Sequence, residues 1–212
     1  MSLFTSQARV GRPNTARAVS APARGSSLAN RDGSYPAHVV RAWRDAIGTA
    51  VEIRPVTVAD AELVHEFIRA LSLEARYMRF MTAVGELAQQ TVDRLARIDH
   101  RLDAALVAFV NNGVADRVVG IAEYSLSVDR YSYDSAVVVA DDWRRRGVGR
   151  LLVALLVDTA AVRGLSRIGG DVLAINRPML AFARALGFDV SASNDPMVRR
   201  VDLNVDRRHA PG

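Results

Sequence analysis

The sequence of 212 residues contains no cysteine and no lysine. Without cysteine the chain can form no disulfide, and it offers neither a thiolate nucleophile nor a thiolate metal ligand. This composition suits a reducing compartment, and we expect a cytoplasmic location. No apolar run approaches the roughly 20 residues that a membrane-spanning helix needs, so we expect no membrane partner. The basic side chains, histidines aside, are therefore all arginines.

The net charge of +5 is carried by the first 50 residues, which hold seven arginines and two acidic residues. The remaining 162 residues hold 21 arginines and 21 acidic residues and are electrically balanced. Residues 1–36 are rich in Ser, Ala, Arg, Pro and Gly with almost no apolar periodicity, which predicts a disordered basic leader. A nucleic-acid arm, an acidic-membrane contact and a transit peptide are alternatives. We favour a solvated tail and expect no nucleic-acid partner.

The dense apolar pattern begins at Val51 and predicts one domain over residues 51–206, with a tail at 207–212. Its order of strands and helices is typical of an α/β (α+β) fold on a mixed sheet. Strands are predicted at 51–54, 104–110, 117–127, 133–140, 167–174, 188–192 and 197–205, and helices at 60–71, 72–80, 87–98, 149–162 and 178–186.

Residues 37–50 form a predicted lead-in segment ahead of this domain. Within it, the apolar residues between positions 38 and 48 recur at roughly helical spacing, which favours a short helix. The four residues that carry this pattern are Val39, Val40, Trp43 and Ile47.

The most informative segment is the turn Arg144–Gly149 (RRRGVG), between an apolar strand and a long predicted helix. The first N–H groups of a helix have no partner inside the helix, and the helix dipole adds positive charge there. Gly147 and Gly149 lack a Cβ, so backbone amides can approach a diphosphate closely. The flanking arginines add charged donors. The segment therefore predicts an anion site.

Two common phosphate-binding turns do not fit this segment. The dinucleotide fingerprint needs a third glycine where this chain has Leu152, and the P-loop needs a lysine that the sequence lacks. The spacing resembles instead the Arg/Gln-x-x-Gly-x-Gly/Ala signature of the GNAT family of N-acetyltransferases. Asn176, Met179, Phe182 and the pair at 187–188 resemble the family's N-x-x-M-x-x-F…G-F segment.

A narrower resemblance, carried by Leu71–Phe80 and by Ala136–Val139 with the Asp-Asp-Trp that follows, is to the acetyltransferase domain of bacterial protein acetyltransferases. Those enzymes acetylate a lysine on acyl-CoA synthetases. The resemblance implies the GNAT fold, with a mixed and mostly antiparallel sheet, and acetyl-CoA as cosubstrate. The residues it implies for acetyl-CoA are Val137, Val138, Val139, Arg144, Arg145, Arg146, Gly147, Val148, Gly149, Arg150, Asn176, Met179 and Phe182. Those it implies for the acceptor are Arg76, Tyr77, Arg79 and Phe80.

An amine must be neutral to attack a thioester, and at pH 7 only roughly one lysine in a few thousand is neutral. A base is therefore expected. Relatives place a glutamate where this chain has Asp134, which is one methylene shorter. Glu123 on the neighbouring strand is the rival candidate. Many relatives also carry a tyrosine as general acid at the position of Ala183, so the leaving thiolate here needs another proton source.

Three functions remain open from the sequence. The leading prediction is acetyl transfer to a protein lysine, with an acyl-CoA and a protein, such as an acyl-CoA synthetase, as partners. Because the chain has no lysine, it could not modify its own side chains. The alternatives are acetylation of a small amine and a non-catalytic acyl-CoA sensor. His65 and His100 are isolated, so no metal site is predicted, and a monomer or homodimer is expected.

Overall fold

The computed structural model describes residues 39–81, 98, 100, 102–111, 113, 115–126 and 133–206. The predicted basic leader at 1–36 lies outside the described residues. The same holds for nearly all of the helix predicted at 87–98.

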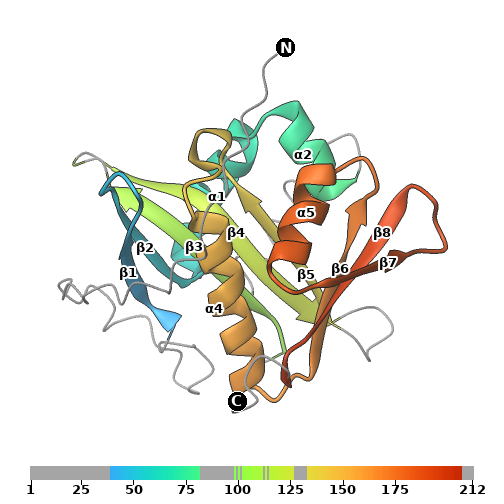
Figure 1. The fold of residues 1–212 in the computed structure, drawn as a ribbon. Helices are drawn as coiled ribbons and strands as arrows, with labels where there is room; N and C mark the ends of the chain where they lie inside the picture. The colour runs from blue at the N-terminus through green and yellow to red at the C-terminus, as the bar shows by residue number, and fades with distance from the viewer. Residues whose placement is uncertain are drawn as a thin grey trace.

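Eight strands form one sheet in the order β1-β2-β3-β4-β5-β6-β8-β7 (Figure 1). Neighbouring strands run antiparallel, except that β5 and β6 are parallel. The predicted α/β fold with a mixed, mostly antiparallel sheet is therefore confirmed. The strands are β1 Arg41–Arg44, β2 Ala50–Pro55, β3 Ala104–Asn111, β4 Asp116–Leu126, β5 Tyr133–Val139, β6 Arg167–Leu173, β7 Asp189–Ala192 and β8 Val198–Asn204.

Helices α4 and α5 cover the front of the sheet in Figure 1, and α1 and α2 lie behind it. Side-chain caps mark where two of them begin: Ser72 accepts a hydrogen bond from the Ala75 amide, and Asn176 accepts one from the Met179 amide. The helices are α1 Ala61–Ala70, α2 Leu73–Phe80, α4 Val148–Val162 and α5 Arg177–Ala185, with short 3-10 turns at Val58–Asp60 and Asp141–Trp143.

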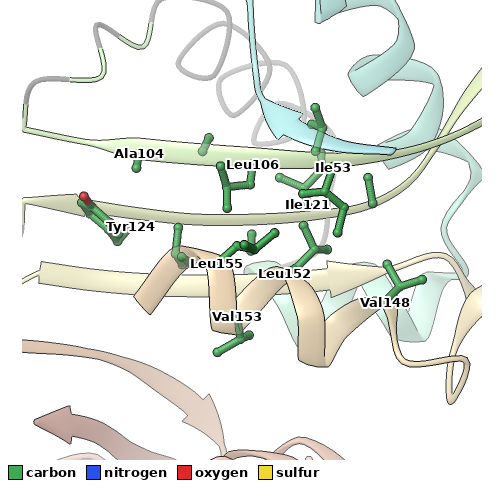
Figure 2. Packing of buried hydrophobic residues seen from close by; sticks show 14 of the residues in the cluster. Ile53, Ala104, Leu106, Ile121, Tyr124, Val148, Leu152, Val153 and Leu155 are labelled. Carbon is green, nitrogen blue, oxygen red and sulfur yellow. The ribbon is translucent and has the colours of Figure 1, made fainter. Parts of the chain in front are cut away.

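The main core lies between α4 and the central strands. In Figure 2, Leu152 and Leu155 of α4 point toward Leu106 and Ile121 of the sheet, and all four side chains are buried. Val153 points away from this layer. The helix is therefore apolar on two sides, and its second side faces the cavity described below.

The helix expected within residues 38–48 is wrong, because the structure has strand β1 there, paired antiparallel with β2. The cause is a tight turn between the two strands. The Asp45 carboxylate accepts hydrogen bonds from the Ile47 and Thr49 amides at 3.1 and 2.8 Å, and Gly48 has a φ of +86°. The turn breaks the helical spacing and leaves Ile47 exposed.

Candidate active site

The strands β5 and β6 meet at a single paired position, Asp134 with Gly169. Here they approach closely: the Ser135 hydroxyl donates to the Gly169 carbonyl at 2.8 Å, and a Cβ on Gly170 would lie 2.5 Å from the Ser135 oxygen. Past this point β5 keeps β4 as its neighbour but has no pairing with β6. The backbone of Ala136–Val139 is therefore an open strand edge, which can hydrogen-bond to an extended ligand.

Two cavities lie along this open edge, and they share residues of α2, β5 and α5. The outer cavity, of about 490 Å³, extends from the edge to the turn before α4. The inner cavity, of about 410 Å³, extends from the edge toward α2 and β8. Because the two share lining, they form one channel past β5. The shared lining residues are Met78, Arg79, Val137, Asn176, Met179 and Phe182.

The outer cavity ends on the predicted anion turn. Gly147 precedes the first residue of α4 and has a φ of +94°, so the turn needs a residue without a Cβ there. A Cβ on Gly149 would lie 3.4 Å from Val139 and 3.6 Å from the Phe182 ring. These contacts bring β5, the start of α4, and α5 together around one opening. Val148 is fully buried and lines neither cavity.

The three arginines of the turn, and Arg150 just after it in α4, differ in their partners. Arg144 forms an ion pair with Asp141 at 2.9 Å. Arg146 turns away from the outer cavity and pairs with buried Asp45. Arg145 and Arg150 line the outer cavity and pair with no acid among the described residues. Arg144 also lines this cavity, so Arg145 and Arg150 are its turn cations without an acidic partner in this part of the chain. The predicted contact of Arg146 with the cofactor stays a prediction.

The inner cavity contains the two predicted carboxylates, on the side of the sheet that α2 covers. Glu123 is buried and forms an ion pair with Arg79 of α2. Asp134, which is half-exposed, receives a hydrogen bond from Arg200 Nη1 at 2.8 Å on Oδ1. Its Oδ2 has no hydrogen-bond partner within the described residues. One carboxylate is thus enclosed and the other open to the cavity.

Arg200 of β8 lies beside three acidic side chains, two of which line the inner cavity. Asp171 and Asp202 lie 3.5 and 3.4 Å from its guanidinium, besides Asp134. Burial lowers the pKa of Arg200, but the bond to Asp134 and the three negative charges outweigh it and leave the pKa above its ordinary value. Arg200 therefore stays charged and fixes one oxygen of Asp134.

The predicted acceptor residues on α2 divide into two pairs. Arg79 and Phe80 line the inner cavity, whereas Arg76 and Tyr77 line neither cavity. Sequence reasoning missed Met78, Met81 and Ser125 as lining residues. It also missed Asp171 and Arg200, whose only signal is a cross-strand pairing between β6 and β8.

The described residues contain no group of three His, Cys, Asp or Glu side chains that could hold a metal ion. His100 is buried, and its Nε2 donates a hydrogen bond to the Val56 carbonyl at 2.9 Å. Among the described helices none is long and apolar enough to cross a membrane.

The model of the Acetyltransferase (GNAT) family matches residues 67–188, which include the open edge, the turn and α5. The chain belongs to this family. It is 32% identical over 162 residues to an acetyltransferase of Pseudomonas aeruginosa, covering 76% of this chain and 87% of that protein. The chain is therefore an acyltransferase, with the GNAT fold that the sequence predicted.

Two solved structures are also similar. The GNAT domain of S. lividans PAT shares 25% identity and a TM-score of 0.72, covering 80% of this chain and 99% of that domain. The structure of yncA from Salmonella typhimurium, with its cofactor acetyl-CoA, shares 22% identity and a TM-score of 0.53 over 76% of this chain and 98% of that one. The second likeness shows the fold alone.

Proposed function

We propose that this GNAT acetyltransferase uses acetyl-CoA and transfers the acetyl group to a primary amine, with a lysine side chain of another protein as acceptor. The observation that carries the proposal is the continuous channel past the open edge of β5. It joins an anion turn at one end to two carboxylates at the other.

The outer cavity fits the cofactor. Arg145, Arg150 and the first amides of α4 supply donors for a diphosphate. From there, the pantetheine arm would follow the open edge of Ala136–Val139, where amide groups of the ligand replace the missing strand partner. Asn176, Met179 and Phe182 line both cavities and would close over that arm. The thioester then reaches the inner cavity.

The inner cavity suits a lysine more than a polyamine. A polycation is best held by several unpaired carboxylates, but Glu123, Asp134 and Asp171 each face an arginine. The rest of the lining is largely apolar and fits the four methylenes of a lysine side chain. The resemblance of Leu71–Phe80 to bacterial protein acetyltransferases also supports a protein acceptor.

The reaction needs a base that accepts a proton from the acceptor amine. The lysine ammonium first gives one proton to a carboxylate, directly or through water. The neutral amine then attacks the thioester carbon and a C–N bond forms. The nitrogen gives its second proton to water as the C–S bond breaks and the coenzyme leaves as a thiolate. Asp134 is the first candidate because it lines the inner cavity and Arg200 bonds only its Oδ1. Glu123 is the second, because it lines the same cavity. Ala183 supplies no acid for the thiolate, so water would protonate it.

The acceptor class is tested with labelled acetyl-CoA and a cell extract. We expect the label in protein, on lysine, and no labelling with the Gly147→Glu variant as control. If label entered only small molecules, the proposal of a protein acceptor would be wrong, but the acetyltransferase activity would stand.

The base is tested by turnover of Asp134→Asn and Glu123→Gln at several pH values. Direct base catalysis by Asp134 predicts a loss of about a hundredfold in kcat near pH 7. We expect this loss to shrink as the pH rises toward the pKa of lysine, because the amine then loses its proton to solvent. Unchanged turnover of Asp134→Asn, with loss in Glu123→Gln, would move the role to Glu123.

A further inference from the structure

The hairpin formed by β1 and β2 is joined to the anion turn by a buried ion pair. The Asp45 side chain is fully buried, and Arg146 donates to it through Nε at 2.8 Å and through Nη2. Nη2 also donates to the Thr49 hydroxyl at 3.0 Å. Burial raises the pKa of Asp45, but hydrogen bonds from the Thr49 amide and Arg146 outweigh it and bring the pKa below its ordinary value. Asp45 is therefore a charged partner.

An aromatic contact adds to this link. A Cβ on Gly147 would lie 3.0 Å from Cη2 of Trp43, so the indole of β1 lies directly against the turn. On the other side, the Arg146 guanidinium stacks 3.7 Å from the ring of Trp143. The Arg146 side chain is thus fixed by an acid, a hydroxyl and a ring, two of them supplied by the hairpin.

The fixed side chain belongs to the residue between two unusual backbone positions. Arg145 has a φ of +60°, which a residue with a side chain rarely adopts, and Gly147 has a φ of +94°. Such a conformation persists only when its surroundings determine it. In this conformation the Arg145 side chain lines the outer cavity, whereas the Arg146 side chain contacts the hairpin.

We propose that the β1–β2 hairpin is a positioning element for the coenzyme's diphosphate. Asp45 and Trp43 line neither cavity, yet they hold Arg146 and Gly147 so that Arg145 and the first amides of α4 face the anion. The inference rests on the proposed use of acetyl-CoA. It assigns Asp45 and Trp43 to cofactor affinity, although both precede the stretch that carries the family's motifs.

The test is calorimetric titration of the full chain with acetyl-CoA. Asp45→Asn keeps the shape of the side chain but removes its charge, and we expect a roughly tenfold higher Kd with one site per chain. Trp43→Ala is the second variant, with a similar expected loss. Arg44→Gln is the matched control, because Arg44 bonds the Gly48 carbonyl at 2.8 Å in the same hairpin and does not contact the anion turn. We expect the control to bind as the unchanged protein does.

The number of sites separates positioning from loss of folding. A partly unfolded variant binds with fewer sites per chain and unchanged Kd, whereas a misplaced turn keeps one site and raises Kd. A double-mutant cycle adds a second measure: if Asp45 acts through Arg146, then Asp45→Asn has no further effect in an Arg146→Gln background.

The outcomes distinguish the two proposals. An unchanged protein that does not bind acetyl-CoA would overturn the proposed function. Binding by that protein, with Asp45→Asn and Trp43→Ala equal to it in Kd, would overturn the hairpin's role and leave the function intact. Fewer sites at unchanged Kd would also overturn this role, because that result would mean that the hairpin stabilises the fold but does not position the turn.

Discussion

The outer and inner cavities share a channel, but they are assembled in different ways. The anion turn of the outer cavity is made by six consecutive residues, Arg144–Gly149, and by the helix that follows them. The inner cavity takes its charged residues from α2, β4, β5 and β6, and Arg200 of β8 pairs with two of them. The first is a local arrangement of backbone, and the second is a set of ion pairs across the sheet. Their responses to substitution should differ accordingly.

The largest expected effect is on the local arrangement. Gly147→Glu places a side chain where φ is +94° and a Cβ would lie 3.0 Å from Trp43, with a carboxylate near the coenzyme's diphosphate. We expect the Kd for acetyl-CoA to rise about a hundredfold, or about 3 kcal/mol, measured by calorimetry. Gly164→Glu is the control, because Gly164 also has a positive φ, +72°, but lies in open space. If Gly147→Glu bound acetyl-CoA as tightly as the unchanged protein, the turn would not be part of the cofactor site.

The second effect concerns the inner cavity and is read in stability. Arg79→Met leaves the buried Glu123 without its arginine, and a buried charge deprived of its partner destabilises a fold strongly. We expect a loss of about 2 kcal/mol in the free energy of unfolding, measured by urea denaturation. The double variant Arg79→Met/Glu123→Gln should recover part of this loss. No recovery would mean that the pair contributes little and that Arg79 stabilises the fold by packing on Phe80.

This contrast also explains what the sequence could predict. The turn at Arg144–Gly149 was identified because glycine spacing, a strand before it and a helix after it all lie within one short segment. The pairing of Asp134 with Arg200, 66 positions apart, depends on β8 lying beside β6, and no local pattern encodes that register. The ion pair between Asp45 and Arg146 spans 101 positions and was missed for the same reason.

The lead-in shows the opposite failure, in which a local pattern was present but misleading. Helical spacing of four apolar residues suggested a helix, yet Asp45 caps a tight turn with its own side chain, and Gly48 supplies the positive φ. Asp45, two residues before the pattern ends at Ile47, and Gly48, one residue after it, carry more weight than the spacing. Among the described residues, the strands and helices predicted after Val51 are confirmed, because their apolar residues face one shared core.

A third prediction concerns an ion pair that is local in sequence but buried. Asp60 accepts hydrogen bonds from Arg54 at 2.6 and 2.7 Å and from the Thr57 amide and hydroxyl. Burial raises the pKa of Asp60, and these bonds outweigh it, so the folded pKa lies below the ordinary value. The stability that Asp60 contributes is present above its unfolded pKa of about 3.9 and is lost as the pH falls through the folded pKa.

Urea denaturation between pH 6 and pH 3 tests this sign. We expect the loss of stability below about pH 4 to be smaller in Asp60→Asn, by about 1 kcal/mol, because that variant has no carboxylate to protonate. The same acid sensitivity in the variant and the unchanged protein would assign it to other carboxylates.

The smallest effect is expected for a surface ion pair between β4 and the 3-10 turn at Asp141–Trp143. Arg117 of β4 bonds both oxygens of Asp142 at 2.8 and 2.9 Å, close to the anion turn, but both side chains are more than half-exposed. Water and salt screen such a pair, so it contributes little to the free energy of unfolding even though its hydrogen bonds are well formed. We expect Arg117→Gln to change the free energy of unfolding by less than about 0.5 kcal/mol and the Kd for acetyl-CoA by less than twofold. A larger rise in Kd, suppressed by salt, would show that this pair also positions the turn and that the buried link from Asp45 is not its sole distant support among the described residues.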